Sequence, residues 1–192
     1  MSFLAVPPVT PEAQRMFDED MAEQGFVANA SRLWAYQPET FNGLFALLNA
    51  AAAPCALTQR QRGILIAATA STMRDSYCSL AWGTRLASTS DADTAAGVLR
   101  GDDSELTPPE RSLAAWARRV AADPNATTSS DIDGLRDAGF SDEEIFAVTV
   151  FVALRIALST VNDALGARPD AAYRDLAPAQ VRAAVSYGRP LA

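Results

Sequence analysis

The chain has 192 residues, 49% of them hydrophobic and 20% charged, which is typical of one globular domain that buries a core without disulfides or metals. Its 16 basic residues, all Arg, stand against 23 acidic residues, and a net charge of −7 argues against a nucleic-acid or anionic-membrane partner. The sequence has no His and no Lys, which excludes Ser-His-Asp and Cys-His pairs, His-ligated zinc and Schiff-base chemistry.

Helix start and stop signals follow one another along the whole chain. Thr10 and Pro11 open a helix that runs to about Gln24, and a second helix begins at Pro38. Capping boxes then predict helices that begin after the following residues: Thr58 (with Gln61), Thr107 (with Glu110) and Ser141 (with Glu144). Short helices fit three further segments: Asp91–Arg100, Ser130–Ala138 and Pro178–Tyr187. Since alternating strand patterns are missing, we expect a single all-α domain over residues 1–192.

The helix that starts after Thr58 is expected to break near Arg74. The β-branched and hydroxyl residues before this point lower helix propensity, and Asp75 is a good N-cap for a new helix. Cys78 would then lie in the first turn, where the positive end of the helix dipole favours a thiolate. The alternative is that Cys78 is a buried apolar residue and that Asp75 only caps the helix.

The segment from Leu57 to Ala67, together with Asp75–Trp82, resembles the core of the carboxymuconolactone decarboxylase family, which includes the alkylhydroperoxidase D-like proteins. The segments Gly139–Ile145 and Leu154–Gly166 resemble closing helices of many members. The resemblance covers roughly residues 38–170, with an N-terminal and a C-terminal helix as extensions. It implies an alkylhydroperoxidase D-like helical bundle, a pocket for a small-molecule substrate, and association as a dimer, trimer or hexamer.

The active-site motif of the peroxidase members is only partly kept. Their pattern is Cys-x-x-Cys-x-x-x-His with a Glu twelve residues before the first Cys. The corresponding residues here are Asp75, Cys78, Trp82 and Gly63, and Tyr77 stands where some members carry a relay His. The resemblance therefore implies Cys78, Asp75 and Tyr77 as catalytic residues, with Trp82 and Gly63 in the pocket, and it rules out a two-thiol cycle within the motif.

Cys55, the other cysteine, is a poor redox partner for Cys78. It precedes a helix of about 16 residues, which carries the chain roughly 24 Å away. A disulfide needs Cα atoms within about 6 Å, so only folding back or a neighbouring subunit would bring the two together.

Arg155 lies within the apolar run Phe146–Leu158, where an unpaired guanidinium is costly. Asn162 shares its helix face, together with Ser159 and Asp163. This polar stripe fits a pocket wall or a subunit contact, and the alternative is a structural ion pair between Arg155 and a nearby acid.

Three functional hypotheses follow. The resemblance favours a peroxidase-type oxidoreductase that keeps one cysteine. The second is a non-redox lyase, isomerase or cyclase in which Asp75 or Tyr77 moves a proton, with burial in a dry cavity favouring the protonated carboxyl. The third is a non-catalytic member that keeps the fold for binding.

The remaining expectations concern cofactor and compartment. Two cysteines and no His predict neither a metal nor a cofactor. No stretch approaches about 20 apolar residues, and the first eight residues lack a basic region, so we expect a cytoplasmic protein without a membrane partner.

Overall fold

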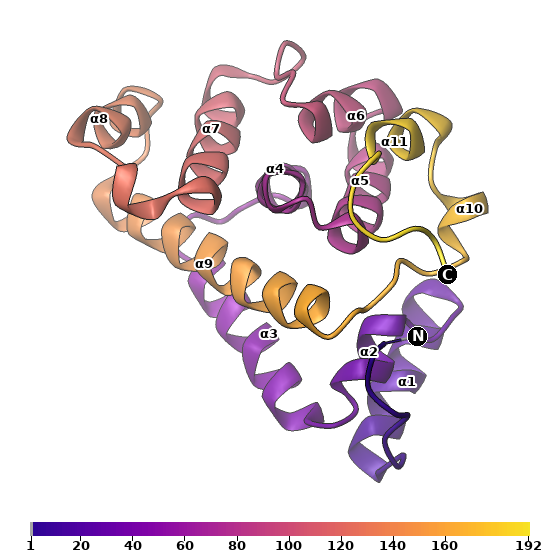
Figure 1. Ribbon diagram of the computed structural model, residues 1–192. Coiled ribbons are helices and arrows are strands. Elements are labelled where there is room, and N and C mark those ends of the chain that lie inside the picture. The colour runs from indigo at the N-terminus through magenta and orange to yellow at the C-terminus, as the bar shows by residue number, and fades with distance from the viewer. Residues whose placement is uncertain (1) are drawn as a thin grey trace.

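The computed structural model describes residues 2–192, and across them the chain forms eleven α-helices, one 3₁₀-helix and no strand (Figure 1). The helices are α1 (Pro11–Gln24), α2 (Asn29–Trp34), α3 (Pro38–Ala52), α4 (Gln59–Met73), α5 (Ser76–Thr89), α6 (Ala92–Arg100), α7 (Pro108–Ala122), η1 (Pro124–Ala126), α8 (Ser129–Asp137), α9 (Asp142–Ala164), α10 (Tyr173–Leu176) and α11 (Ala179–Ala184). The predicted all-α class is confirmed.

Most helices begin where their capping residues predict. Thr58 and Gln61 form a reciprocal capping box at the start of α4, because the Gln61 N–H donates to the Thr58 hydroxyl and the Gln61 side chain accepts the Thr58 N–H. Ser141 and Glu144 do the same for α9. The sequence pattern missed α2 and α10, which have no side-chain cap.

The last predicted helix is shorter than expected. It ends at Ala184 rather than Tyr187, because the chain leaves helical geometry there and turns back over α5. The Tyr187 hydroxyl donates to Ser79 Oγ at 3.0 Å, and Ser76 Oγ both donates to the Arg189 carbonyl and accepts the Arg189 N–H. The C-terminal segment therefore fixes the start of α5.

Helix α4 is the centre of the bundle, and Figure 1 shows it end-on among its neighbours. It packs most extensively on α5 and α7, and it also contacts α6 and α9. Its residues from Gly63 to Ala70 are all buried. A helix that is buried on every side is a core helix, so α4 fixes the positions of the helices around it.

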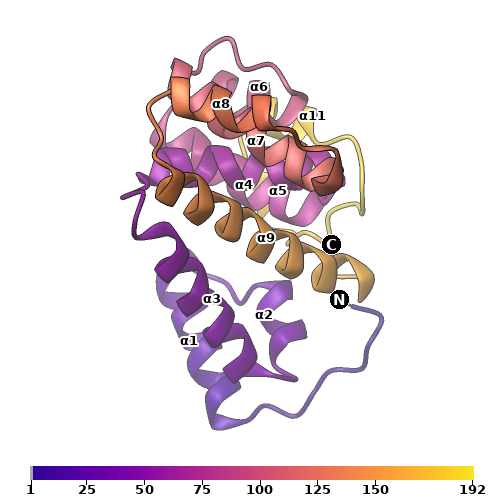
Figure 2. The ribbon, with the colours of Figure 1, turned by 90° about the vertical axis from the view of Figure 1, so that its left-hand side faces the viewer.

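Helix α9 separates two groups of helices. Figure 2 shows α4–α8 and α11 on one side and α1–α3 on the other, and α3 packs along α9. By length and composition alone, α9 is apolar enough to cross a membrane. In this structure its inner face packs on α3, α4 and α7 and buries Arg155, as expected of a core helix.

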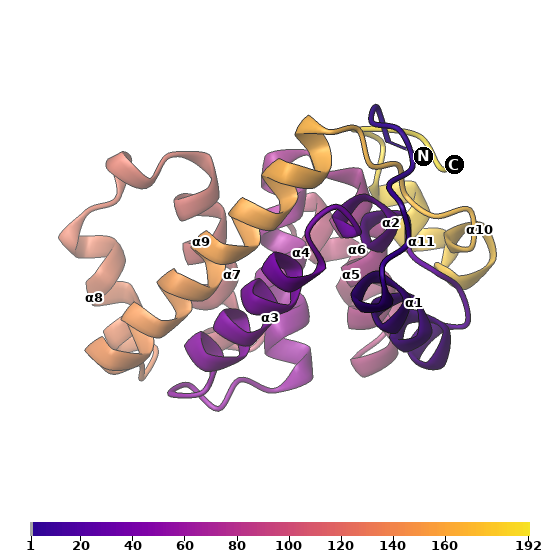
Figure 3. The same ribbon diagram turned by 90° about the horizontal axis from the view of Figure 1, so that it is seen from below.

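The two ends of the molecule are formed by different segments of the chain. Seen from below, α8 lies at one end, while α10, α11 and both termini lie at the other (Figure 3). The Phe3 N–H donates to the Leu165 carbonyl, and the Ala192 N–H donates to the Pro169 carbonyl. Both terminal segments are thus attached to the chain that follows α9.

Candidate functional site

The break between α4 and α5 places Cys78 at a helix start. Arg74 ends α4 in the left-handed conformation with φ +60°, and Asp75 is the N-cap of α5. Asp75 Oδ1 accepts the Cys78 N–H at 2.9 Å. The predicted break and the predicted cap are both confirmed, and they bring a carboxylate and a thiol together at a buried position.

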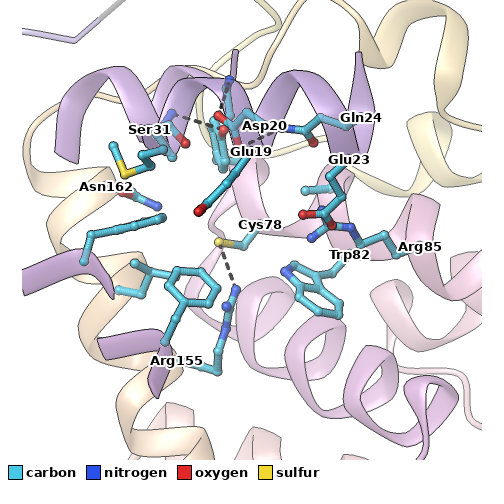
Figure 4. Close-up of a pocket in the computed structure, with 18 of the residues that line it drawn as sticks. Glu19, Asp20, Glu23, Gln24, Ser31, Cys78, Trp82, Arg85, Arg155 and Asn162 are labelled. Carbon is cyan, nitrogen blue, oxygen red and sulfur yellow. Dashed lines mark hydrogen bonds and ion pairs between the residues drawn. The ribbon is translucent and has the colours of Figure 1, made fainter. Parts of the chain in front are cut away.

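Cys78 lies at the inner end of a cavity of about 450 Å³, which Figure 4 shows between α1, α5 and α9. Five of the seven predicted site residues line this cavity: Tyr77, Cys78, Trp82, Arg155 and Asn162. The outer part is lined by charged side chains, mainly from α1: Glu19, Asp20, Glu23 and Arg85. The cavity therefore has a charged mouth and an inner end that holds the thiol.

Two hydrogen-bond donors contact the Cys78 sulfur. Arg155 Nη2 donates to Sγ at 3.7 Å, and Ser159 Oγ donates at 3.6 Å. Burial, followed by the charge of Asp75, raises the pKa of the Cys78 thiol far above its usual value, while Arg155 and Ser159 oppose that rise. The activation expected from the helix dipole is outweighed, because desolvation and the adjacent carboxylate both favour the protonated thiol.

Arg155 is 3% exposed and makes no ion pair within 4 Å in the described part of the chain, so the structural ion-pair alternative is wrong. Its guanidinium lies 5.3 Å from the centre of the Trp82 ring, and its Nε has no hydrogen-bond partner. Burial lowers the pKa of Arg155, and Cys78 and Asp75 act against that change. Within the polar stripe of α9, Arg155 and Asn162 line the cavity, whereas Asp163 pairs with Arg189.

The hydroxyl of Tyr77 is already engaged within the protein. It donates to Asp170 Oδ2 at 2.8 Å and accepts the Ala30 N–H at 3.1 Å, while Asp170 Oδ1 accepts the Asn29 N–H. Burial, followed by the charge of Asp170, raises the pKa of Tyr77 well above its usual value. Tyr77 thus joins α5 to α2, and its predicted catalytic role stays a prediction.

Asn162 is also held in place, because its Oδ1 accepts the Trp34 Nε1–H at 2.9 Å. This bond connects α9 to α2 on the cavity wall. The partners Asp170 and Trp34 were not foreseen, since they are 93 and 128 residues away in sequence from the side chains that they bind. The acidic residues of α1 were not foreseen either, because nothing in their spacing distinguishes them from a solvated helix face.

Two predicted site residues do not line the cavity. Gly63 lies inside the α4–α5 contact, where a Cβ atom would be 3.3 Å from Leu86 Cβ. A small residue is needed there for close helix packing, so the prediction that Gly63 lines the substrate pocket is wrong. Asp75 is fully buried behind Cys78, and its Oδ2 has no hydrogen-bond partner.

Cys55 is far from this site. Its sulfur donates to the Glu144 carbonyl at 3.2 Å, near the start of α9, whereas Cys78 contacts Arg155 further along the same helix. The rise of α9 between those two positions is about 16 Å. Both cysteines are free, and this separation excludes a disulfide between them in one chain. Among residues 2–192 no group of three Cys, Asp or Glu side chains is arranged to hold a metal ion.

The inner end of the cavity is thus a single-thiol site. A sulfur atom faces the cavity, with a guanidinium and a hydroxyl donating to it and an aromatic ring beside it. Donors of this kind stabilise negative charge on sulfur, which is the charge that a thiol develops as it attacks an electrophile.

Comparison with known proteins identifies the fold. No model of a known protein family matches the sequence, and no curated protein matches it. An uncharacterized peroxidase-related protein from Ralstonia eutropha JMP134, described as an alkylhydroperoxidase AhpD core, superposes with a TM-score of 0.79 and 23% identity over 90% of this chain and 94% of its own. An uncharacterized peroxidase-related protein from Silicibacter sp. TM1040 superposes with a TM-score of 0.79 and 21% identity, over 91% of this chain and 94% of its own.

A third structure with this fold has a different activity in its name. It is a cysteine-to-alanine variant of the debrominase Bmp8 in complex with 2,3,4-tribromopyrrole, with a TM-score of 0.71 and 17% identity over 90% of this chain and 95% of that one. The chain described here therefore has the alkylhydroperoxidase D-like fold, which confirms the fold that the sequence resemblance implied.

Proposed function

We propose that the protein is a single-cysteine, peroxidase-type oxidoreductase in which Cys78 reduces a peroxide held in the cavity. The observation that supports this most is the contact of the Cys78 sulfur with Arg155 and Ser159 at the inner end of the cavity. The names of two structures with the same fold, both peroxidase-related, agree with this activity.

The chemistry needs one thiol in the protein and an external thiol as reductant. The sulfur attacks the terminal oxygen of a hydroperoxide, an S–O bond forms and the O–O bond breaks. The leaving alkoxide takes the proton that the thiol loses, so Cys78–SH and R–OOH give Cys78–SOH and R–OH. Two equivalents of an external thiol then return Cys78–SH and release a disulfide and water.

Each neighbour of the sulfur has a role in this scheme. Arg155 and Ser159 donate to the sulfur as it becomes negative, and the Trp82 ring lines the cavity beside Arg155. Asp75 caps α5, and its charge adds to the effect of burial, which is the main cause of the raised pKa of the Cys78 thiol. Because the thiol pKa is raised, we expect peroxide reduction to be slow at neutral pH and to accelerate steadily as the pH rises to 10.

The acid–base alternative has less support. It requires Asp75 or Tyr77 to reach a substrate, but Asp75 does not line the cavity and the Tyr77 hydroxyl is bound to Asp170 and Ala30. The free Oδ2 of Asp75 is the one observation in its favour.

The activity is tested by following consumption of cumene hydroperoxide with dithiothreitol as reductant. The native protein and Cys55→Ser should turn over at the same rate, and Cys78→Ser should fall to the rate of the buffer. Equal rates for native protein and Cys78→Ser would exclude the proposed function. A small-molecule substrate and a cytoplasmic location remain part of the same proposal.

A further inference from the structure

A permanent cation, rather than a proton donor, is the charged group that touches the Cys78 sulfur within the described residues. The Arg155 guanidinium does not give up a proton in proteins, so it stabilises negative charge without neutralising it. The two phenols that line the same cavity are poor acids. Tyr77 already donates to Asp170, and burial raises the pKa of Tyr173 to about 12.

The presence of a cation and the lack of a good acid favour one kind of leaving group in the substrate. An alkyl hydroperoxide releases an alkoxide, which needs a proton at once, and in this cavity the thiol is the nearest source of one. A peroxycarboxylic acid releases a carboxylate, which is stable as an anion and needs a cation instead of a proton. Arg155 supplies that cation beside the sulfur.

Arg155 also has free donors for such an anion. A guanidinium carries five N–H donors in a planar fork that matches a carboxylate, and the only acceptor it finds among residues 2–192 is Cys78 Sγ. Its Nε is buried without a partner, and the side chain as a whole is 3% exposed. Figure 4 shows the guanidinium directed toward Cys78 and the cavity.

The rest of the inner cavity fits an uncharged body attached to that carboxylate. Apolar side chains from three helices line the cavity: Leu158 from α9, Trp82 from α5, and Phe41 and Phe45 from α3, of which Phe45 is 36% exposed. The rings of Phe41 and Phe45 lie 4.7 Å apart and form one continuous apolar wall. A volume of about 450 Å³ is within the usual range for small-molecule sites.

We propose that the substrates are peroxycarboxylic acids with an apolar, aryl-sized body, whose carboxylate leaving group is held by Arg155. This inference rests on the function proposed above. In the reaction, Cys78–SH and R–CO–O–OH give Cys78–SOH, R–COO⁻ and one proton. The S–O bond forms, the O–O bond breaks, the carboxylate leaves onto Arg155, and the thiol proton passes to solvent. External thiols then regenerate Cys78 as before.

The first test compares two oxidants under single-turnover conditions. Peroxybenzoic acid and cumene hydroperoxide are each mixed with the native protein, Arg155→Met and Arg136→Met. Arg155→Met should slow the reaction with peroxybenzoic acid by roughly 100-fold or more, the scale of losing a preorganised oxyanion donor, and the reaction with cumene hydroperoxide by less than about tenfold. Arg136→Met is the control, because Arg136 lies on the surface and does not line the cavity, and it pairs there with Asp133 and Asp142. It should leave both rates within about threefold.

The second test measures the anion subsite without any thiol chemistry. Calorimetry on Cys78→Ser should detect binding of benzoate, the product-like carboxylate, and no binding of the neutral isostere benzamide. Arg155→Met added to Cys78→Ser should weaken benzoate binding by about 30-fold or more.

The outcomes separate the two proposals. Benzoate binding that is unaffected by Arg155→Met, or equal binding of benzoate and benzamide, overturns the substrate class. If Cys78 reduces cumene hydroperoxide and peroxybenzoic acid with equal dependence on Arg155, the peroxidase function stands and the substrate class fails. If Cys78 reacts with neither oxidant, the proposed function fails, and benzoate binding alone then decides whether Arg155 forms an anion subsite. Should Arg155→Met not fold, the comparison of benzoate with benzamide in Cys78→Ser decides alone.

Discussion

Replacing Asp75 by Asn isolates the electrostatic effect of the carboxylate on the Cys78 thiol. Asn caps a helix about as well as Asp, so α5 and the bond to the Cys78 N–H should persist. The charge of Asp75 is the second cause, after burial, of the raised thiol pKa. Unit charges about 4 Å apart interact by about 4 kcal/mol at an effective dielectric constant near 20. Allowing half of that for solvent in the cavity leaves about 2 kcal/mol, which is roughly 30-fold in thiolate population.

We therefore expect iodoacetamide to alkylate Cys78 about 30-fold faster at pH 8 in Asp75→Asn than in native protein. Both proteins carry Cys55→Ser, so that mass spectrometry follows Cys78 alone. The matched control is Asp163→Asn, which removes a half-buried carboxylate from the neighbouring helix α9 and should change the rate by less than about threefold. An unchanged or slower rate in Asp75→Asn would refute the electrostatic reasoning.

The same variant separates the thiol hypothesis from the acid–base hypothesis. If Asp75 is a general acid or base, its replacement by Asn lowers turnover by roughly 10²–10⁴. If Asp75 only holds the thiol protonated, Asp75→Asn reduces cumene hydroperoxide faster than the native protein does.

Four further predictions concern the site and the surface. Asp75→Cys should form an internal disulfide with Cys78, because the N-cap and N3 positions of a helix are within disulfide range. Thiol titration after oxidation should then find two fewer thiols per chain, and an unchanged thiol count would contradict this geometry. Tyr77→Phe should lower the free energy of unfolding by about 1–3 kcal/mol in urea titrations, because it leaves two buried partners unpaired, while Cys78 alkylation stays unchanged. Burial raises the pKa of Asp163 from 3.8 to about 6, so the folded state retains a proton that the unfolded state loses as the pH rises from about 4 to about 6. The ionised carboxyl therefore destabilises the fold increasingly over that range. The free energy of unfolding of Asp163→Asn, relative to that of the native protein, should rise by about 1 kcal/mol between pH 4 and pH 7, after discounting for the partial exposure of Asp163. A difference that stays constant with pH would contradict the raised pKa. Light scattering should find a dimer or larger assembly, because α3 leaves apolar side chains exposed, among them Leu47 with 58% of its surface exposed. Leu47→Glu should lower the measured mass of the assembly, and a strictly monomeric native protein would exclude this interface.

Local signals in the sequence were sufficient for the helices and for the position of the thiol. Capping boxes at Thr58 and Ser141 involve residues three apart, so their geometry is settled within one helical turn. The break before Asp75 likewise depends on neighbouring residues. The short helix α2 carries no such signal, since Ala28 gives it no side-chain cap and its position depends on tertiary contacts.

The electrostatic balance at Cys78 could not be predicted in the same way. The dipole of α5 is a local property, but desolvation depends on how many helices cover the thiol, and Arg155 is 77 residues away from Cys78 in the sequence. Spacing on α9 did indicate that Arg155, Ser159 and Asn162 share one face. Which neighbour that face meets is decided by the packing of α9 against α3 and α4.

Gly63 illustrates how a motif position can mislead. The resemblance to the family motif placed it where the peroxidase members of that family carry a Glu, and the sequence alone does not distinguish a pocket residue from a helix contact. The close approach of Leu86 makes it a packing residue here.

Trapping of sulfenic acid tests the central claim most directly. Native protein is treated with one equivalent of cumene hydroperoxide at pH 9 in the presence of dimedone, and the adduct is located by mass spectrometry. The account predicts a dimedone adduct on Cys78, none on Cys55, and no adduct after Cys78→Ser. Consumption of the peroxide without an adduct on Cys78, or an adduct on Cys55 alone, would contradict it.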